Sequence, residues 1–65
     1  MGCVTIKEVT VGNLAAEMLD YGDLAGDMPR YSICYLVERR YNVQHCETIE
    51  EAEKFWQKLL DNQAA

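Results

Sequence analysis

The sequence predicts a small α+β domain in which a three-stranded sheet carries two helices on one face, in the order β-α-β-β-α. Apolar residues alternate with polar ones in three segments, which is typical of strands, and recur at helical spacing in two others. Each predicted element has one apolar side to bury, so placing both helices on one face of the sheet is the economical arrangement. The 65 residues are expected to form one domain, residues 1–65.

The first strand is predicted at residues 3–9, where Val4 and Ile6 alternate with Thr5 and Lys7. Whether this strand pairs with the second or the third predicted strand is left open by the sequence. A parallel pairing with the second strand would require a right-handed connection.

The first helix is predicted at residues 10–22, because the apolar residues of this segment fall on one helical face. Thr10 can cap its first turn, and Asn13 is a competing cap that would start the helix later. Gly22 stands where a left-handed C-terminal cap favours a residue without a β-carbon. The predicted apolar stripe consists of Val11, Leu14, Ala15, Met18 and Leu19.

A connection at residues 22–30 leads to a predicted hairpin of two strands, residues 31–37 and 41–47. Pro29 precedes the hairpin, since proline cannot donate a hydrogen bond within a sheet. No Asn-Gly or Asp-Gly pair marks the turn between the strands, so the turn type and the pairing register stay open.

The second helix is predicted at residues 48–62. Thr48 and Glu51 form a capping box, in which the threonine hydroxyl accepts from the amide of residue 51. Glutamates in the first turn suit the helix dipole. The apolar stripe expected to cover the sheet consists of Ile49, Ala52, Phe55, Trp56, Leu59 and Leu60.

Histidine and cysteine stand side by side near the end of the hairpin, as His45 and Cys46. Alternate side chains of a strand point to opposite faces, so these two are expected to diverge and not to form a nucleophile–base pair. We therefore expect no enzyme and no cofactor. One alternative remains a metal- or thiol-dependent protein that uses Cys34, His45 and Cys46, although their spacing lacks the short paired ligands of a typical zinc site.

The chain carries 11 acidic and 6 basic residues, for a formal net charge of −5. An acidic surface repels phosphate and attracts basic surfaces, so we expect a basic protein partner and no direct binding of nucleic acid. Excess acid can also serve solubility alone. No apolar run reaches membrane-spanning length, and the cysteine count is odd, which favours a reducing compartment; a cytoplasmic protein with no membrane contact is expected.

These features predict a small acidic protein-interaction module, an inhibitor or adaptor that docks on the basic surface of a larger protein. Phage inhibitors of bacterial defence nucleases are an analogy in size and charge. A structural homodimer that hides surplus apolar surface is the second hypothesis. The residues predicted to contact a partner are Glu17, Asp20, Asp23, Asp27, Tyr35, Arg39, Arg40 and Tyr41.

Overall fold

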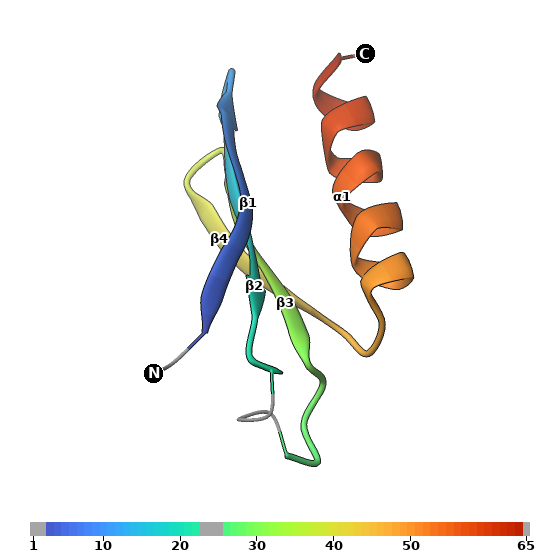
Figure 1. Ribbon diagram of the computed structural model, residues 1–65. Coiled ribbons are helices and arrows are strands. Elements are labelled where there is room, and N and C mark those ends of the chain that lie inside the picture. Colours follow the sequence, from blue (N-terminus) through green and yellow to red (C-terminus); the bar gives the residue numbers. More distant parts are fainter. Residues whose placement is uncertain (1–2, 23–25, 65) are drawn as a thin grey trace.

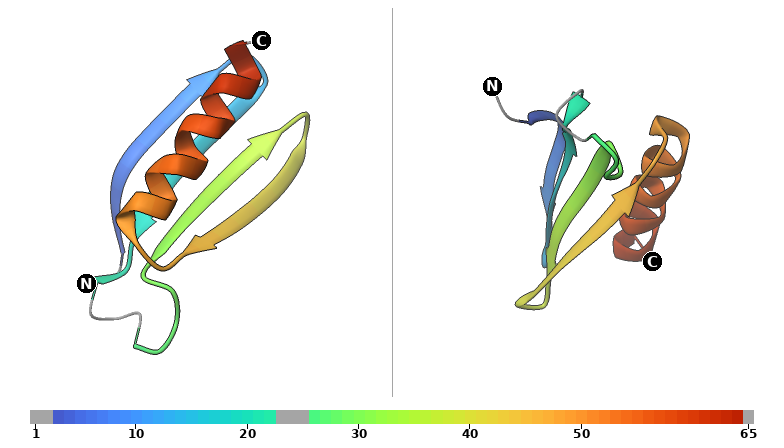
Figure 2. Two further views of the ribbon diagram at one scale, coloured as in Figure 1. Left: turned by 90° about the vertical axis from the view of Figure 1, so that its right-hand side faces the viewer. Right: turned by 90° about the horizontal axis from the view of Figure 1, so that it is seen from below.

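Four antiparallel strands form a single sheet in chain order, and one helix lies across one face of it (Figure 1). The computed structural model describes residues 3–22 and 26–64, with side chains up to residue 62. Two further views show α1 on one side of the sheet, and none of the described helices or strands covers the other side (Figure 2). The elements are β1 (Val4–Val11), β2 (Leu14–Asp20), β3 (Tyr31–Val37), β4 (Arg40–Cys46) and α1 (Ile49–Ala64).

The predicted fold, a three-stranded sheet with two helices on one face, is wrong: the described residues form a four-stranded antiparallel sheet and a single C-terminal helix. The helix expected at residues 10–22 is instead the end of β1, a two-residue turn and strand β2. The turn consists of Gly12 and Asn13, and Gly12 has a φ of 55°. Glycine at the first central position, with a positive φ, is the preference of a type II′ hairpin turn. Gly-Asn between two apolar runs was therefore a hairpin signal, and Asn13 is not a helix cap.

The segment that forms β2 was predicted to be a helix because it is a central strand with apolar residues on both faces. Its burial alternates: Leu14, Ala16 and Met18 are buried, while Glu17 between them is exposed. Alanine, leucine and methionine are also strong helix formers, so local propensity favoured the wrong element until pairing with β1 and β3 decided it. Gly22 has a positive φ of 56°, but it follows a strand and not a helix.

The second hairpin is confirmed, with β4 beginning at Arg40. Glu38 and Arg39 form its turn with φ values of 49° and 69°. Two positive φ values in a two-residue hairpin loop are the requirement of a type I′ turn, which Asn-Gly usually meets. The turn was unrecognisable in the sequence because neither residue is a typical occupant.

The core lies between α1 and the facing side of β2 and β3. Met18, Ile33 and Ala52 are fully buried, and Trp56 is nearly so. The predicted helix stripe is confirmed, as its other members pack against these residues. One of the two bonds of the predicted capping box is confirmed, since the amide of Glu51 donates to Thr48 Oγ1 at 3.2 Å. Among the described residues, no helix is long and apolar enough to cross a membrane.

Candidate functional site

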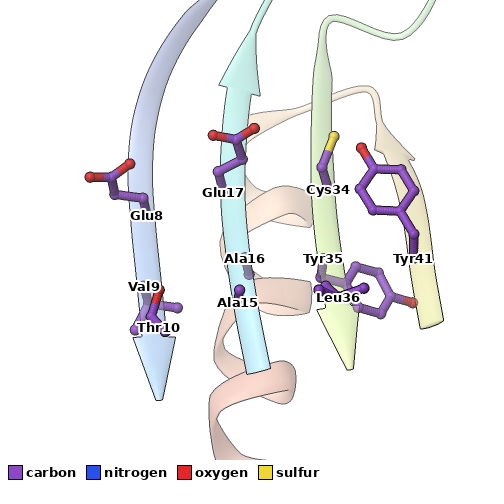
Figure 3. Close-up of a pocket in the computed structure, with 10 residues that line it drawn as sticks. All are labelled: Glu8, Val9, Thr10, Ala15, Ala16, Glu17, Cys34, Tyr35, Leu36 and Tyr41. Atoms are coloured by element: carbon purple, nitrogen blue, oxygen red, sulfur yellow. The ribbon is translucent and has the colours of Figure 1, made fainter. Parts of the chain in front are cut away.

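The side of the sheet opposite α1 carries three rows of side chains, each of which crosses all four strands. We name this surface the open face; Figure 3 shows part of it with α1 behind the strands. The antiparallel registers set the rows, since residues paired across neighbouring strands point to the same side. The rows are Thr5–Leu19–Ser32–His45, Glu8–Glu17–Cys34–Val43 and Thr10–Ala15–Leu36–Tyr41.

Strand β4 turns its apolar side toward the open face. Tyr41 is 68% exposed and Val43 is 44% exposed, and Leu36 of β3 lies directly opposite Tyr41 with 41% of its surface exposed. The reason is the two-residue turn, which pairs Val37 with Arg40. Because Val37 packs toward the core under α1, Arg40 must point to that side, and Tyr41 to the other. These adjacent exposed side chains make β4 the apolar edge of the open face.

The other half of the open face is acidic. Glu8 of β1 and Glu17 of β2 are directly paired, and both are exposed. Like charges opposite one another destabilise a sheet, and among the described residues neither glutamate makes an ion pair. A hollow of about 500 Å³ runs from these carboxylates to Leu36 and Tyr41 (Figure 3). A cation brought by a partner would relieve the repulsion.

Cys34 of β3 and Tyr41 of β4 lie next to each other at the β3–β4 side of this hollow (Figure 3). A hydrogen bond with Cys34, followed by the charge of that group, raises the pKa of Tyr41 above its ordinary 10.0, and Glu17 acts in the same direction. The Tyr41 phenol is therefore neutral at physiological pH. A neutral phenol offers a partner both an apolar ring and a hydrogen-bonding hydroxyl.

His45 and Cys46 point to opposite sides of the sheet, as predicted. His45 lies on the open face, where its Nδ1 is 2.9 Å from Ser32 Oγ; Ser32 is fully buried, so this hydrogen bond satisfies a hydroxyl that solvent does not reach. Cys46 is buried on the helix side, and burial raises the pKa of its thiol. Cys34 and Cys46 thus lie on opposite faces. In residues 3–22 and 26–64, no three histidine, cysteine or acidic side chains come together as a set of metal ligands.

The structure divides the predicted contact residues among several places. Glu17 and Tyr41 share the hollow of the open face. Tyr35 points to the helix side, where its ring lies 5.5 Å from that of Phe55, so it belongs to the packing under α1. Arg39 lies in the turn, and Arg40 begins β4 on the helix side.

Asp20 does not share the open face with Glu17, because it points to the helix side of the sheet. Asp20 ends β2 and accepts hydrogen bonds from Arg30 at 2.8 and 3.2 Å and from the Gly22 amide at 2.8 Å. The bond from Arg30, and then that from Gly22, hold the pKa of Asp20 below its ordinary 3.8. Asp27 is exposed in the loop, and Asp23 lies outside the described residues. Asp20 therefore closes the loop as a structural ion pair.

Sequence reasoning missed three residues of the open face, Glu8, Leu36 and Val43. Glu8 faces Glu17 only because Gly12 and Asn13 close a hairpin, so recognising that turn would have paired the two acids. Alternation along residues 41–47 already placed Val43 with Tyr41, but which side the helix covers was not readable from the pattern. No family model, curated protein or solved structure matches this chain.

Proposed function

We propose that this protein is a small acidic interaction module whose open face docks on a basic surface of a partner protein. The observation that carries the proposal is the exposed apolar side of β4 next to the Glu8–Glu17 pair. The net charge of −5 supports it, because opposite fields accelerate encounter and reject unsuitable surfaces.

The two halves of the open face have different roles in this contact. Tyr41, Leu36 and Val43 pack against apolar side chains, and exposed tyrosine is a frequent centre of binding energy. Glu8 and Glu17 receive a lysine or arginine from the partner, which replaces their mutual repulsion with attraction. Apolar contact thus supplies affinity, while the paired acids select a cationic partner.

A second copy of this chain fits the open face less well than a basic partner does. Among the twelve residues of the three rows there is no lysine or arginine, and His45 is the one basic side chain. Two open faces packed together would leave Glu8 and Glu17 buried without a cation, which is costly. The surface chemistry therefore favours a different protein over self-association.

Proteins that handle nucleic acids are the partner class with the most extensive basic surfaces. An acidic module bound there would compete with phosphate for the same cations. This is the basis for assigning an inhibitory or adaptor role to the protein. It requires no catalytic group.

The proposal is tested by affinity capture from an extract of the native host, with the full chain immobilised. Glu8→Gln/Glu17→Gln removes the acidic half of the open face, and Tyr41→Ser removes its largest apolar contact. Glu47→Gln/Glu50→Gln is the matched control, because both residues are exposed and lie outside the open face. We expect proteins captured by the wild type to be lost with both open-face variants and retained with the control. Their capture should weaken in about 1 M salt, where the Debye length is about 3 Å.

Capture of the same proteins by the wild type and by both open-face variants would contradict the proposal. So would an extract in which no captured protein depends on the open face. Backbone amide spectra of each variant, recorded alongside, establish that the fold is retained.

A further inference from the structure

A second candidate surface lies on the other side of β4, between that strand and α1. The left view of Figure 2 shows β4 at the edge of the sheet, not beneath the helix, with β3 between the two. Two adjoining cavities of about 730 and 420 Å³ occupy this position, and both are lined by Phe55 and Lys58. We name them together the β4–α1 groove. The polar residues that line it are Glu38, Arg40, Asn42, Gln44, Glu51, Lys54, Lys58 and Asn62.

Basic side chains line the groove, although the protein as a whole is acidic. Three of the chain's six basic residues line it: Arg40, Lys54 and Lys58. Outside the groove, Lys7 pairs with Glu53 at 3.7 Å and Arg30 pairs with Asp20 at 2.8 Å. Within the part of the chain that the structure describes, the three groove cations make no ion pair. Acidic residues outnumber basic ones nearly twofold, so the chain has enough carboxylates to pair with these cations.

The floor of the groove is apolar. Phe55 and Tyr35 pack there with ring centroids 5.5 Å apart, and Leu59 lies beside them. The rim combines charged donors with the amide groups of Asn42 and Gln44, all on exposed residues. An apolar floor with a few polar groups around it is the usual composition of a ligand site.

We propose that the β4–α1 groove binds an acidic, extended segment of a partner polypeptide. Lys54 and Lys58 stand four residues apart on α1, so they are separated by about 6 Å along the helix axis. Alternate side chains of an extended chain are about 6.7 Å apart, so two carboxylates at alternate positions match the two lysines. Arg40 lies across the groove on β4 and can hold a further carboxylate through two parallel hydrogen bonds.

A peptide fits the charge distribution of the groove better than a nucleic acid does. Glu38 lines the larger cavity and Glu51 the smaller one, so the cations are flanked by acids. A nucleic acid carries a phosphate at every nucleotide, and its backbone would pass from the cations onto these carboxylates. A peptide places negative charge only where its sequence has aspartate or glutamate.

The test uses the full chain, labelled with ¹⁵N, and three probes. The first is a capped peptide of about eight residues that alternates glutamate with leucine; the second replaces each glutamate with lysine; the third is an oligothymidylate of about eight nucleotides. We expect the glutamate peptide to give saturable shifts of the Asn42 and Gln44 side-chain amides and of the Phe55 and Lys58 backbone amides. We expect the lysine peptide and the oligothymidylate to leave these signals unchanged.

Paired variants separate local charge from total charge. Arg40→Gln/Lys58→Gln removes two groove cations and is expected to weaken binding of the glutamate peptide about tenfold. Lys7→Gln/Arg39→Gln changes the net charge equally at sites outside the groove and is expected to leave the affinity within about twofold. The proposal is overturned by equal loss in both variants, by no saturable shift, by shifts centred on Glu17 and Cys34, or by tighter binding of oligothymidylate. These variants leave the open face intact, so the result is independent of the proposed function.

Discussion

The two faces of the sheet differ in how completely they bury apolar side chains, although the same four strands form both faces. On the helix side of β2 and β3, Met18 and Ile33 have no exposed surface. On the open face, Leu36 follows Ile33 by three residues on the same strand and remains 41% exposed. Folding stability is therefore concentrated on one side, and the other side leaves apolar surface exposed to solvent.

Strand β4 shows the same contrast in its most pronounced form. Two of its apolar residues, Tyr41 and Val43, point away from α1, while Arg40, Asn42 and Gln44 point toward the helix side, where Cys46 alone joins the core. A strand that served the core alone would have the opposite orientation. The arrangement leaves an acidic and apolar open face on one side and the cationic β4–α1 groove on the other.

The largest expected effect on the free energy of unfolding comes from truncating a buried side chain of β3, with an exposed side chain of the same strand as the control. Ile33→Ala should destabilise the fold by about 3 kcal/mol, because it opens a cavity in the core under α1. Leu36→Ala, its control on the opposite face of the same strand, should cost less than about 1 kcal/mol, since the side chain is already partly in water. Urea unfolding followed by Trp56 fluorescence measures both. Equal losses would show that the open face carries as much of the stability as the helix side.

The turn that orients β4 can be made more stable by substituting its two residues. Glu38 and Arg39 adopt positive φ values that cost L-residues with side chains roughly 1–2 kcal/mol each. Glu38→Asn/Arg39→Gly supplies the preferred residues of a type I′ turn and should raise the free energy of unfolding by about 1–2 kcal/mol. The same urea experiment measures the gain.

Unchanged amide pairings across β3 and β4 in the turn variant would show that the helix still faces the polar side of β4. A stability equal to or below that of the wild type would mean that the turn is not strained.

The smallest expected effect concerns Asp20, on the helix side at the end of β2. Its pKa is lowered in the folded state by the hydrogen bonds from Arg30 and Gly22, so its ionised form stabilises the fold. That contribution is present above its ordinary 3.8 and is lost as the pH falls through the lower folded-state value. Asp20→Asn should be less stable than the wild type near neutral pH, and the difference should vanish in strong acid.

Thermal unfolding at a series of pH values measures this difference. Asp27→Asn, in the exposed part of the same loop, is the matched control. A stability difference between Asp20→Asn and the wild type that stayed constant with pH would show that the carboxylate charge is not what closes the loop.

Several elements were readable from local pattern. The helix cap at Thr48, the buried position of Trp56 and the divergence of His45 and Cys46 follow from spacing alone, and the structure confirms each. Of the predicted contact residues, Glu17 and Tyr41 lie together on the open face. Their neighbours Glu8 and Leu36 were missed, because they join the surface through pairing between strands and not through spacing along the chain.

The sequence by itself determined the alternation of β3 and β4, the amphipathic C-terminal helix and the acidic balance of the chain. Tertiary structure decided that residues 14–20 form a strand, because pairing with β1 and β3 outweighs helix propensity in a short segment. It also decided which side of β4 the helix covers. A two-residue turn pairs Val37 with Arg40, and since side chains alternate along a strand, that one pairing fixes the direction of every residue that follows in the strand.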